Sequence, residues 1–286
     1  MSHASQLPEP QPATGYTHDV TFQRNRVVKR FRSARHGEPI REWRALQLLK
    51  RYAPDLAPGP ISAELDKVPS TVMMTRLPGR ALAGAPTTEE EASLIIGAVL
   101  RLHAAVPTHQ VADIEYSISH ARIEIPKLQR WAKRAKVPGT ACMNASKDLQ
   151  VICALHLVLS WLRTSEPERL MNEDGLLCFG QSDPNMRNFI RDGDVMRIVD
   201  FEDSGRTDTA TELADLVEHI TMRDTPEGVW AAALAAHAPP AFSERFLMAR
   251  RMKASYWFLR SLAKADSPGA YAEQHRCAAR VHALMS

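Results

Sequence analysis

The segment Gln181-Ser-Asp-Pro-Asn-Met-Arg-Asn188 holds side chains that suit proton transfer and cation binding. A hydroxyl is a weak nucleophile, and a carboxylate within hydrogen-bonding distance can take its proton as it attacks phosphorus. Asp183 directly follows a short apolar stretch and lies in a loop, where catalytic groups are common. Asn188 and Asp200 add oxygen atoms of the kind that Mg²⁺ prefers. The spacing predicts a base and two metal ligands at one edge of a β-hairpin.

A small β-rich island in the second half of the chain must position these groups. Residues 176–179 form a short apolar strand candidate. Asp192-Gly193 stands between the apolar residues 189–190 and 195–199, which is a strong signal for a hairpin turn. From Ala210 onward the pattern predicts helices to the end of the chain.

The first third of the chain predicts a second β-rich region with one helix. Strands are expected over 20–22, 26–31 and 71–74, and Pro39 suits the first turn of a helix over 40–52. In that helix the expected buried face holds Ile40, Trp43, Leu46 and Leu49, with Leu48 as the alternative to Leu49. Further helices are expected after a capping box at 88–91 and over 116–136 and 147–166. The fold class is therefore α+β, with a β-rich part followed by a mainly helical part.

Residues 179–205 resemble the catalytic core of the aminoglycoside phosphotransferase and choline kinase-like families, distant relatives of protein kinases. Their loop reads H-x-D-x-x-x-x-N, which residues 181–188 match except at the first position. Ile198-Val-Asp-Phe-Glu202 is similar to the family's second metal segment, and Asp208-Thr-Ala-Thr-Glu-Leu-Ala214 is similar to its G-D-P-x-x-D-L-A. The resemblance extends from residue 15 to about residue 220.

This resemblance implies a bilobal protein-kinase-like fold. Residues 15–79 would form a small nucleotide-binding lobe with a hinge at 74–79, and residues 80–286 a helical lobe with the catalytic loop and the substrate pocket. Residues 1–14, rich in Pro, Ser, Gln and Ala, are expected to form a flexible tail.

The same resemblance implies transfer of the γ-phosphate of ATP, or of GTP, to a small-molecule hydroxyl with Mg²⁺. Asp183 would be the base, and Asn188 and Asp200 the metal ligands. Lys29 would bind the phosphates, with Glu42 in the helix as its partner; Glu38 is the alternative partner. The expected nucleotide contacts are completed by Gly15 and Thr17 in the phosphate-covering loop and by Thr75 and Leu77 in the hinge.

An acidic stretch over residues 200–218 suggests a cationic acceptor such as an aminoglycoside or a cyclic peptide antibiotic. Asp203 and Glu218 are the candidate substrate contacts. The alternative is that the helical acidic residues form a solvated face. For Glu212 we favour a third role that the resemblance implies, that of the family's structural carboxylate, which braces the catalytic loop. His219 is interpreted as an ordinary helix residue.

Gln181 stands where the family has histidine. Glutamine can also donate and accept hydrogen bonds, so we expect it to keep the scaffold role. The departure leaves a catalytically silent, nucleotide-binding pseudokinase as an alternative to an antibiotic-resistance kinase. Kinases for choline, methylthioribose or sugar-like metabolites are further alternatives. A protein kinase is disfavoured because no Ala-Pro-Glu segment follows Asp200.

The composition argues against other classes of protein. A net charge of +3 on 286 residues, without a basic stripe, gives no reason to expect nucleic acid as a partner. The four cysteines lack C-x-x-C spacing, which disfavours zinc or redox sites. No apolar run approaches the roughly 18 residues of a membrane span. We therefore expect a cytoplasmic enzyme, either a monomer or a homodimer.

Overall fold

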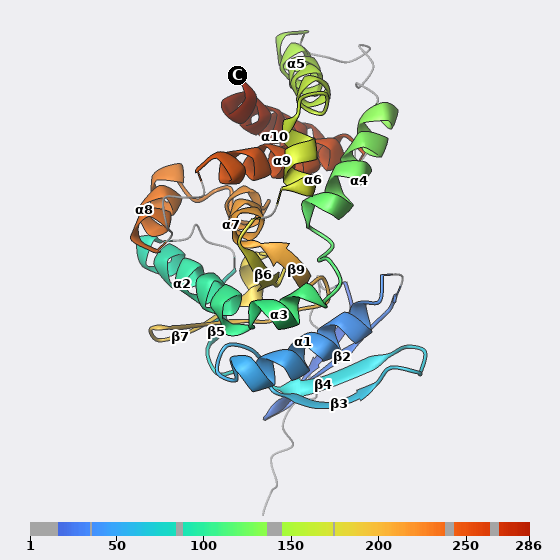
Figure 1. Ribbon diagram of the computed structural model, residues 1–286, viewed down its shortest axis with the longest axis vertical. Coiled ribbons are helices and arrows are strands. Elements are labelled where there is room, and N and C mark those ends of the chain that lie inside the picture. Colours follow the sequence, from blue (N-terminus) through green and yellow to red (C-terminus); the bar gives the residue numbers. More distant parts are fainter. Residues whose placement is uncertain are drawn as a thin grey trace, which may run out of the picture.

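The computed structural model describes residues 17–34, 36–83, 88–135, 145–173, 175–237, 243–263 and 269–286. Its fold is α+β, as predicted: a β-rich part with one helix is followed along the chain by a larger, mainly helical part (Figure 1). Gly15 and the expected tail at 1–14 lie outside the described residues. The division of the chain at residue 79 remains a prediction.

An antiparallel sheet in the order β1-β2-β4-β3 forms the first part. The strands are β1 (Asp19–Phe22), β2 (Arg26–Arg30), β3 (Pro60–Glu64) and β4 (Thr71–Thr75). Lys29 lies on the inner strand β2, paired with Val20 on one side and Val72 on the other. Because both neighbours hydrogen-bond to its strand, the backbone of Lys29 is fixed at the middle of the sheet.

Helix α1 (Glu38–Tyr52) packs against β3 and β4. Pro39 occupies its first turn, as expected. The buried face differs from the predicted one, because Ile40 is 44% exposed whereas Glu42 is fully buried. A rule that places only apolar residues on the buried face cannot predict an inward-facing glutamate. Here Glu42 is paired with the buried Lys29.

Five short strands form the second β-rich region: β5 (Arg80–Ala81), β6 (Leu177–Gly180), β7 (Phe189–Asp192), β8 (Val195–Ile198) and β9 (Gly205–Asp208). The predicted β7–β8 hairpin is present, with Gly193 at φ 59° in its turn. A 3-10 turn at Met186–Asn188 leads into β7. Strand β9 was not expected from the sequence; it pairs with β6 and so brackets the segment that carries Asp183.

Helices make up the rest of the described chain. Helix α2 (Glu89–Ala105) begins with the predicted capping box at Thr88 and Glu91. The expected helix over 116–136 begins later, as α4 (Ala121–Arg134), because Tyr116 and Ser117 bond to Arg206 of β9 instead. The other helices are α3 (Thr108–Ala112), α5 (Ala145–Trp161), α6 (Glu166–Asn172), α7 (Thr209–Glu218), α8 (Glu227–His237), α9 (Ser243–Leu262) and α10 (Ala270–Met285).

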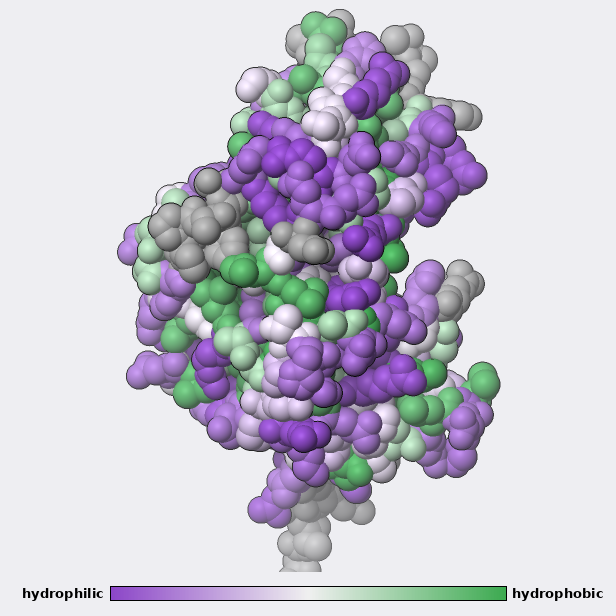
Figure 2. All heavy atoms as spheres, viewed as in Figure 1, coloured by the Kyte–Doolittle hydropathy of each residue, from purple (hydrophilic) through white to green (hydrophobic). Residues whose placement is uncertain are grey.

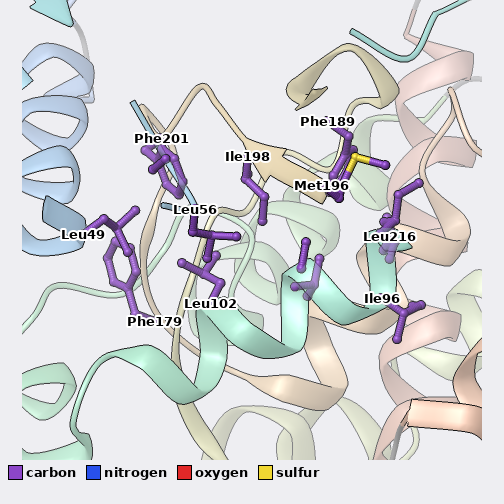
Figure 3. Packing of buried hydrophobic residues seen from close by; sticks show 14 of the residues in the cluster. Leu49, Leu56, Ile96, Leu102, Phe179, Phe189, Met196, Ile198, Phe201 and Leu216 are labelled. Atoms are coloured by element: carbon purple, nitrogen blue, oxygen red, sulfur yellow. The ribbon is translucent and has the colours of Figure 1, made fainter. Parts of the chain in front are cut away.

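One apolar core runs from the first part of the chain into the second. Leu49 and Leu56 of the first third pack in the same cluster as Leu102, Phe179 and Phe201 (Figure 3). A second cluster lies among α4, α5, α9 and α10. The first cluster fixes the relative position of α1, which carries Glu42, and the strand ends that carry Asp183 and Asp200. Among the helices that the structure describes, none is long and apolar enough to cross a bilayer.

Candidate active site

The loop that carries Asp183 is held by a buried carboxylate. Glu212 of α7 accepts hydrogen bonds from the Gln181 amide (3.1 Å), the Ser182 amide (3.3 Å) and the Ser182 hydroxyl (2.7 Å). Ser182 adopts a left-handed backbone, with φ 66°, which costs energy for a side chain with a Cβ. Three bonds to one carboxylate offset that cost, so Glu212 has the bracing contacts expected of it.

Burial raises the pKa of Glu212 to about 7, although the hydrogen bonds from Ser182 act in the opposite direction. Gly180 explains how the carboxylate fits there. A Cβ at that position would lie 2.4 Å from the Glu212 Cδ and 2.5 Å from a methyl group of Thr207. Only glycine leaves room for the brace.

Gln181 joins the loop to the segment around Asp200. Its Nε2 donates to the carbonyl oxygens of Val199 (3.2 Å) and Asp200 (2.7 Å), and its Oε1 accepts from the Asp183 amide (2.9 Å). The side chain is buried, with 4% of its surface exposed. Glutamine therefore makes the scaffold contacts that we expected it to retain.

The carboxylate of Asp183 is oriented from two sides. Asn188 donates its amide hydrogens to the carbonyl (2.9 Å) and the carboxylate (3.1 Å) of Asp183. His219 Nε2 lies 3.6 Å from the other carboxylate oxygen. About a third of the Asp183 side chain stays exposed, so a substrate can reach it.

Lys29 lies at the centre of a buried charge cluster. Its ammonium is 3.0 Å from Glu42 and 2.7 Å from Glu202, and it also bonds to Asp200. Burial acts to lower the pKa of Lys29, but these three carboxylates outweigh burial and raise it well above its ordinary value. The predicted pair of Lys29 and Glu42 is thus one contact of a larger group.

The three carboxylates around Lys29 are not equivalent. Burial raises the pKa of Asp200 to about 7, aided by the nearby charges of Glu42 and Glu202 and opposed by Lys29. For Glu202, a hydrogen bond from His18 and the charge of Lys29 outweigh burial and lower the pKa to about 2. The backbone of Asp200 is left-handed, with φ 67°. Such strain is typical of residues placed for function.

A cavity of about 200 Å³ opens beside this cluster, between the N-terminal sheet and the β7–β8 hairpin. Its polar lining includes Lys29, Glu42, Asn188 and Asp200. Its apolar walls come from both β-rich regions and include Val20, Val27, Met74, Ile190 and Val199. A largely apolar slot that ends in a cation and carboxamide or carboxylate oxygens fits a planar ring joined to phosphates.

Comparison with known proteins agrees with this geometry. The sequence model of the phosphotransferase enzyme family, APH, matches residues 11–249, which is most of the chain. The chain belongs to this family of phosphotransferases. Among individual curated sequences, none matches the chain significantly.

Several solved structures share the fold of this phosphotransferase. A choline/ethanolamine kinase family protein from Mesorhizobium loti has a TM-score of 0.63 at 18% identity, over 99% of this chain and 90% of the other. A thermostable mutant of an aminoglycoside phosphotransferase scores 0.64 at 14% identity, over 97% and 94%. A macrolide 2′-phosphotransferase from Brachybacterium faecium scores 0.62 at 16% identity, over 96% and 92%. At such identities, the likeness concerns the fold.

The phosphotransferase brings most of its predicted site residues together. Thr75 and Leu77 line the cavity with Lys29, although the Thr75 amide already donates to the Gly59 carbonyl (2.8 Å). Thr17 is described and exposed, and it is not one of the residues that line the cavity. Asp203 is half-buried near Asp183, whose charge adds to burial in raising the pKa of Asp203 well above its usual range.

Glu218 is buried in ion pairs. Its side chain is 2% exposed, and both carboxylate oxygens bond to arginines of α9 and α10. Arg250 Nε lies 2.7 Å from one oxygen and Arg280 Nε lies 2.6 Å from the other. These pairs occupy the carboxylate, so Glu218 does not supply the free negative charge that we expected for a cationic substrate.

Three residues of the phosphotransferase site were missed by sequence reasoning. Glu202 and His18 meet at 2.9 Å beside Lys29, and His219 lies against Asp183 instead of being an ordinary helix residue. Only Glu202 had a sequence signal, since it stands in the segment that follows Asp200. The other two are brought in by tertiary contacts across the chain.

The donor set fits a divalent cation of the kind that this family is expected to use. Carboxylate oxygens of Glu42, Asp200 and Glu202 lie within 4.8 Å of one another. Asn188 donates its amide nitrogen to Asp183, which leaves its amide oxygen for another partner in the cavity. Within the described residues, Glu42 Oε1 is buried without a hydrogen-bond donor. Hard oxygen ligands of this type suit Mg²⁺.

Proposed function

We propose that this phosphotransferase moves the γ-phosphate of ATP, or of GTP, to a hydroxyl of a small molecule, with Asp183 as the base. The observation that carries the proposal is the position of Asp183. It is accessible, is fixed by Asn188 and His219, and lies one loop away from a cavity that ends at Lys29. Related folds support nucleotide use, since a spectinomycin phosphotransferase was solved with ADP and spectinomycin.

The nucleotide would enter the 200 Å³ cavity with its base against the apolar walls. Thr75 and Leu77 lie at the end of the cavity where β4 leaves the sheet, and Lys29 lies at the other end. Lys29 would contact the phosphates while Glu42 keeps it from swinging away. Residues 15–79 would then act as a nucleotide-binding lobe, with 74–79 as its hinge and Gly15 and Thr17 covering the phosphates.

The transfer step can be written with Asp183 as proton acceptor. The acceptor oxygen forms a bond to the γ-phosphorus, the bond from that phosphorus to the β–γ bridging oxygen breaks, and ADP leaves. The hydroxyl proton passes to the Asp183 carboxylate oxygen nearer the acceptor. Asn188 holds the Asp183 carboxylate in one rotamer, so the reaction does not have to order that side chain and lose its conformational entropy.

Asn188 and Asp200 would hold Mg²⁺, with Glu202 close enough to contribute. Bound there, the ion would offset phosphate charge as negative charge shifts toward the leaving group. The left-handed backbone at Asp200 and the hydrogen bond from Gln181 to its carbonyl keep the carboxylate aimed into the cavity. In this structure Asp200 also bonds to Lys29, so the ion would share that carboxylate with the ammonium.

Two classes of acceptor fit the site. An antibiotic acceptor, as in a resistance kinase, and a metabolite acceptor both fit a solvent-accessible Asp183. A silent pseudokinase is the weaker alternative, because Asp183, Asn188 and Asp200 are all present and Gln181 makes the scaffold contacts. A pseudokinase has no need of an oriented base.

The decisive experiment compares wild type with Asp183→Asn and with Asp194→Asn, a matched loss of charge at the exposed hairpin turn. Purified proteins are incubated with Mg-ATP and a panel of antibiotics and hydroxylated metabolites, and products are screened for a mass gain of one phosphate. We expect Asp183→Asn to lose about 10²–10⁴-fold in kcat and to keep its affinity for ADP. Asp194→Asn should behave as wild type. Undiminished transfer by Asp183→Asn rejects Asp183 as the base.

A further inference from the structure

A ladder of aromatic rings leads away from the candidate base. His219, which contacts Asp183, meets Trp257 of α9 edge-on, with ring centroids 4.9 Å apart. Trp257 contacts Tyr256 at 5.2 Å, and Tyr256 contacts Trp131 of α4 at 5.5 Å. The three rings other than that of His219 belong to half-buried side chains of α4 and α9, so an acceptor placed at Asp183 has this ladder beside it.

Two cations lie on this ladder. The Lys127 ammonium sits 4.9 Å from the centre of the Trp131 ring and 4.8 Å from that of Tyr256. The Arg260 guanidinium lies 5.1 Å from the Trp257 ring and donates to the Tyr256 hydroxyl at 3.1 Å. Ring faces hold cations in place without neutralising their charge.

Among the described residues, no carboxylate lies within ion-pair distance of Lys127 or Arg260. In this respect Arg260 differs from the other cations of its own helix, which are all paired. Those pairs are Arg245 with Asp208, Arg250 with Glu218, Arg251 with Glu166, and Lys253 with Glu124. Arg260, left without a counter-ion on a helix whose other cations are paired, is therefore a candidate for binding an anion from outside.

Lys127 lies within electrostatic reach of Arg260 and of the acidic residue Asp203. Burial lowers the pKa of Lys127, and the charges of Lys253 and Arg260 lower it further, while Glu124 and Asp203 oppose them. Asp203 is in turn within electrostatic reach of Asp183. Figure 1 places α4 above the β-rich part, and Figure 2 shows the surface hollowed between them on the right.

We infer that the acceptor in the proposed phosphotransfer is a hydroxylated compound that carries a carboxylate, which Lys127 and Arg260 bind while the hydroxyl faces Asp183. This inference rests on the proposed function and adds the acceptor's charge. One negative charge relieves the repulsion between the two cations, and the rings give a planar acceptor apolar contact. A second negative charge on the acceptor would be repelled by Asp183 and Asp203. A polycation would meet Lys127 and Arg260 and would find Glu218 already paired.

The test uses three probes of one shape: 4-(hydroxymethyl)benzoate, 4-(hydroxymethyl)benzamide and 4-(aminomethyl)benzyl alcohol. Their affinities for the full-length protein with Mg-ADP are measured by tryptophan fluorescence and by calorimetry. We expect the carboxylate probe to bind at least about tenfold more tightly than the other two, as for one charge-assisted hydrogen bond. Lys127→Gln and Arg260→Gln should each remove most of this preference.

Lys133→Gln is the matched control, because Lys133 is exposed on α4, the helix of Lys127, and its substitution removes the same charge. It should keep the tenfold preference. Thermal unfolding and ADP affinity of each variant verify that it folds. The inference is overturned if the amide or the ammonium probe binds as tightly as the carboxylate probe, or if none of the three binds. It is also overturned if both Lys127→Gln and Arg260→Gln keep the preference for the carboxylate.

A separate measurement distinguishes failure of this inference from failure of the proposed function. Phosphate transfer from Mg-ATP to kanamycin, a polycation, is assayed beside transfer to the benzoate probe. Transfer to kanamycin alone overturns the carboxylate inference and leaves the kinase assignment standing. Equal transfer by wild type and Asp183→Asn rejects the proposed mechanism, whatever the charge of the acceptor.

Discussion

The side-chain amide of Gln181 donates to the main-chain carbonyl of Asp200 at 2.7 Å. The same amide accepts from the Asp183 backbone, so one buried side chain ties the loop of the candidate base to the segment of the candidate metal ligand. A histidine with one donor and one acceptor nitrogen could replace most of this link. The hydrogen bonds of residue 181 therefore help to set the distance between the two aspartates.

We predict that Gln181→Ala is impaired and that Gln181→His is tolerated. Alanine leaves the carbonyls of Val199 and Asp200 and the amide of Asp183 without their partner, which should cost about 1–3 kcal/mol in the free energy of unfolding. We also expect at least tenfold lower kcat for Gln181→Ala, roughly 1.4 kcal/mol in the barrier. Denaturant unfolding and steady-state kinetics test both variants. An alanine variant as stable and active as wild type contradicts the tie.

Lys29→Met should destabilise the protein at neutral pH. It leaves Glu42, Asp200 and Glu202 close together without the cation that now compensates them, at an expected cost of about 3–5 kcal/mol. Protonation of these carboxylates relieves their repulsion, so the deficit should shrink as the pH falls from about 7 to 5. Added Mg²⁺ should raise the melting temperature of Lys29→Met more than that of wild type.

The control for Lys29 is Lys67→Met. Lys67 pairs with Glu64 at the surface, where both side chains are more than half exposed. An exposed pair contributes only about 0–1 kcal/mol, so this variant should unfold as wild type and show no special response to Mg²⁺. Equal melting temperatures for Lys29→Met and wild type at pH 7 count against the charge cluster as a structural element.

Local sequence signals predicted the parts of the site that lie close together in the chain. The Asp192-Gly193 turn gave the β7–β8 hairpin, and the spacing of Asp183, Asn188 and Asp200 placed three side chains around it. The contact of Lys29 with Glu42 was also expected, from the resemblance to the phosphotransferase families.

The missed features depend on contacts between distant segments. Strand β9 holds Gly205, Arg206, Thr207 and Asp208, which show no apolar alternation; it is a strand because β6 pairs with it. Gly205 also lets the chain near residue 116 approach, since a Cβ there would lie 2.6 Å from the Glu115 carbonyl. His18 and His219 reach the site only through the tertiary fold, and a single sequence carries no signal for such meetings.

Glu212→Gln should change how stability varies with pH. The folded pKa of Glu212, about 7, lies above the ordinary value of 4.5, so the folded state binds this proton more tightly than the unfolded state. Its contribution to stability is then fully present below about pH 4.5 and is lost as the pH rises through 7. The unfolding free energy of wild type, relative to the glutamine variant, should fall by about 3 kcal/mol over that range.

Chemical denaturation at half-unit pH steps from 4 to 8 measures this difference (~9 curves per protein, spaced to resolve one titration). Glu168→Gln is the matched control, because Glu168 is exposed on α6. Its curve should run parallel to that of wild type. If the stability of Glu212→Gln varies with pH in parallel with that of wild type, then burial does not raise the pKa of the Glu212 carboxyl.

Gly180→Ala should disturb the brace beneath Asp183 directly. The new methyl group would lie 2.4 Å from the Glu212 Cδ and 2.5 Å from Thr207, and both side chains are buried, so the carboxylate must move away from Ser182. We expect a loss of about 1–3 kcal/mol in unfolding free energy, together with lower kcat at unchanged ADP affinity. Gly97→Ala in α2 is the matched substitution, since nothing lies within 4 Å of its Cβ position. Alanine favours the helix there by up to about 1 kcal/mol, so this variant should be more stable and fully active. The two alanine variants thus have opposite expected signs, and a Gly180→Ala protein that gains stability like Gly97→Ala contradicts the role of Glu212 as the support of the catalytic loop.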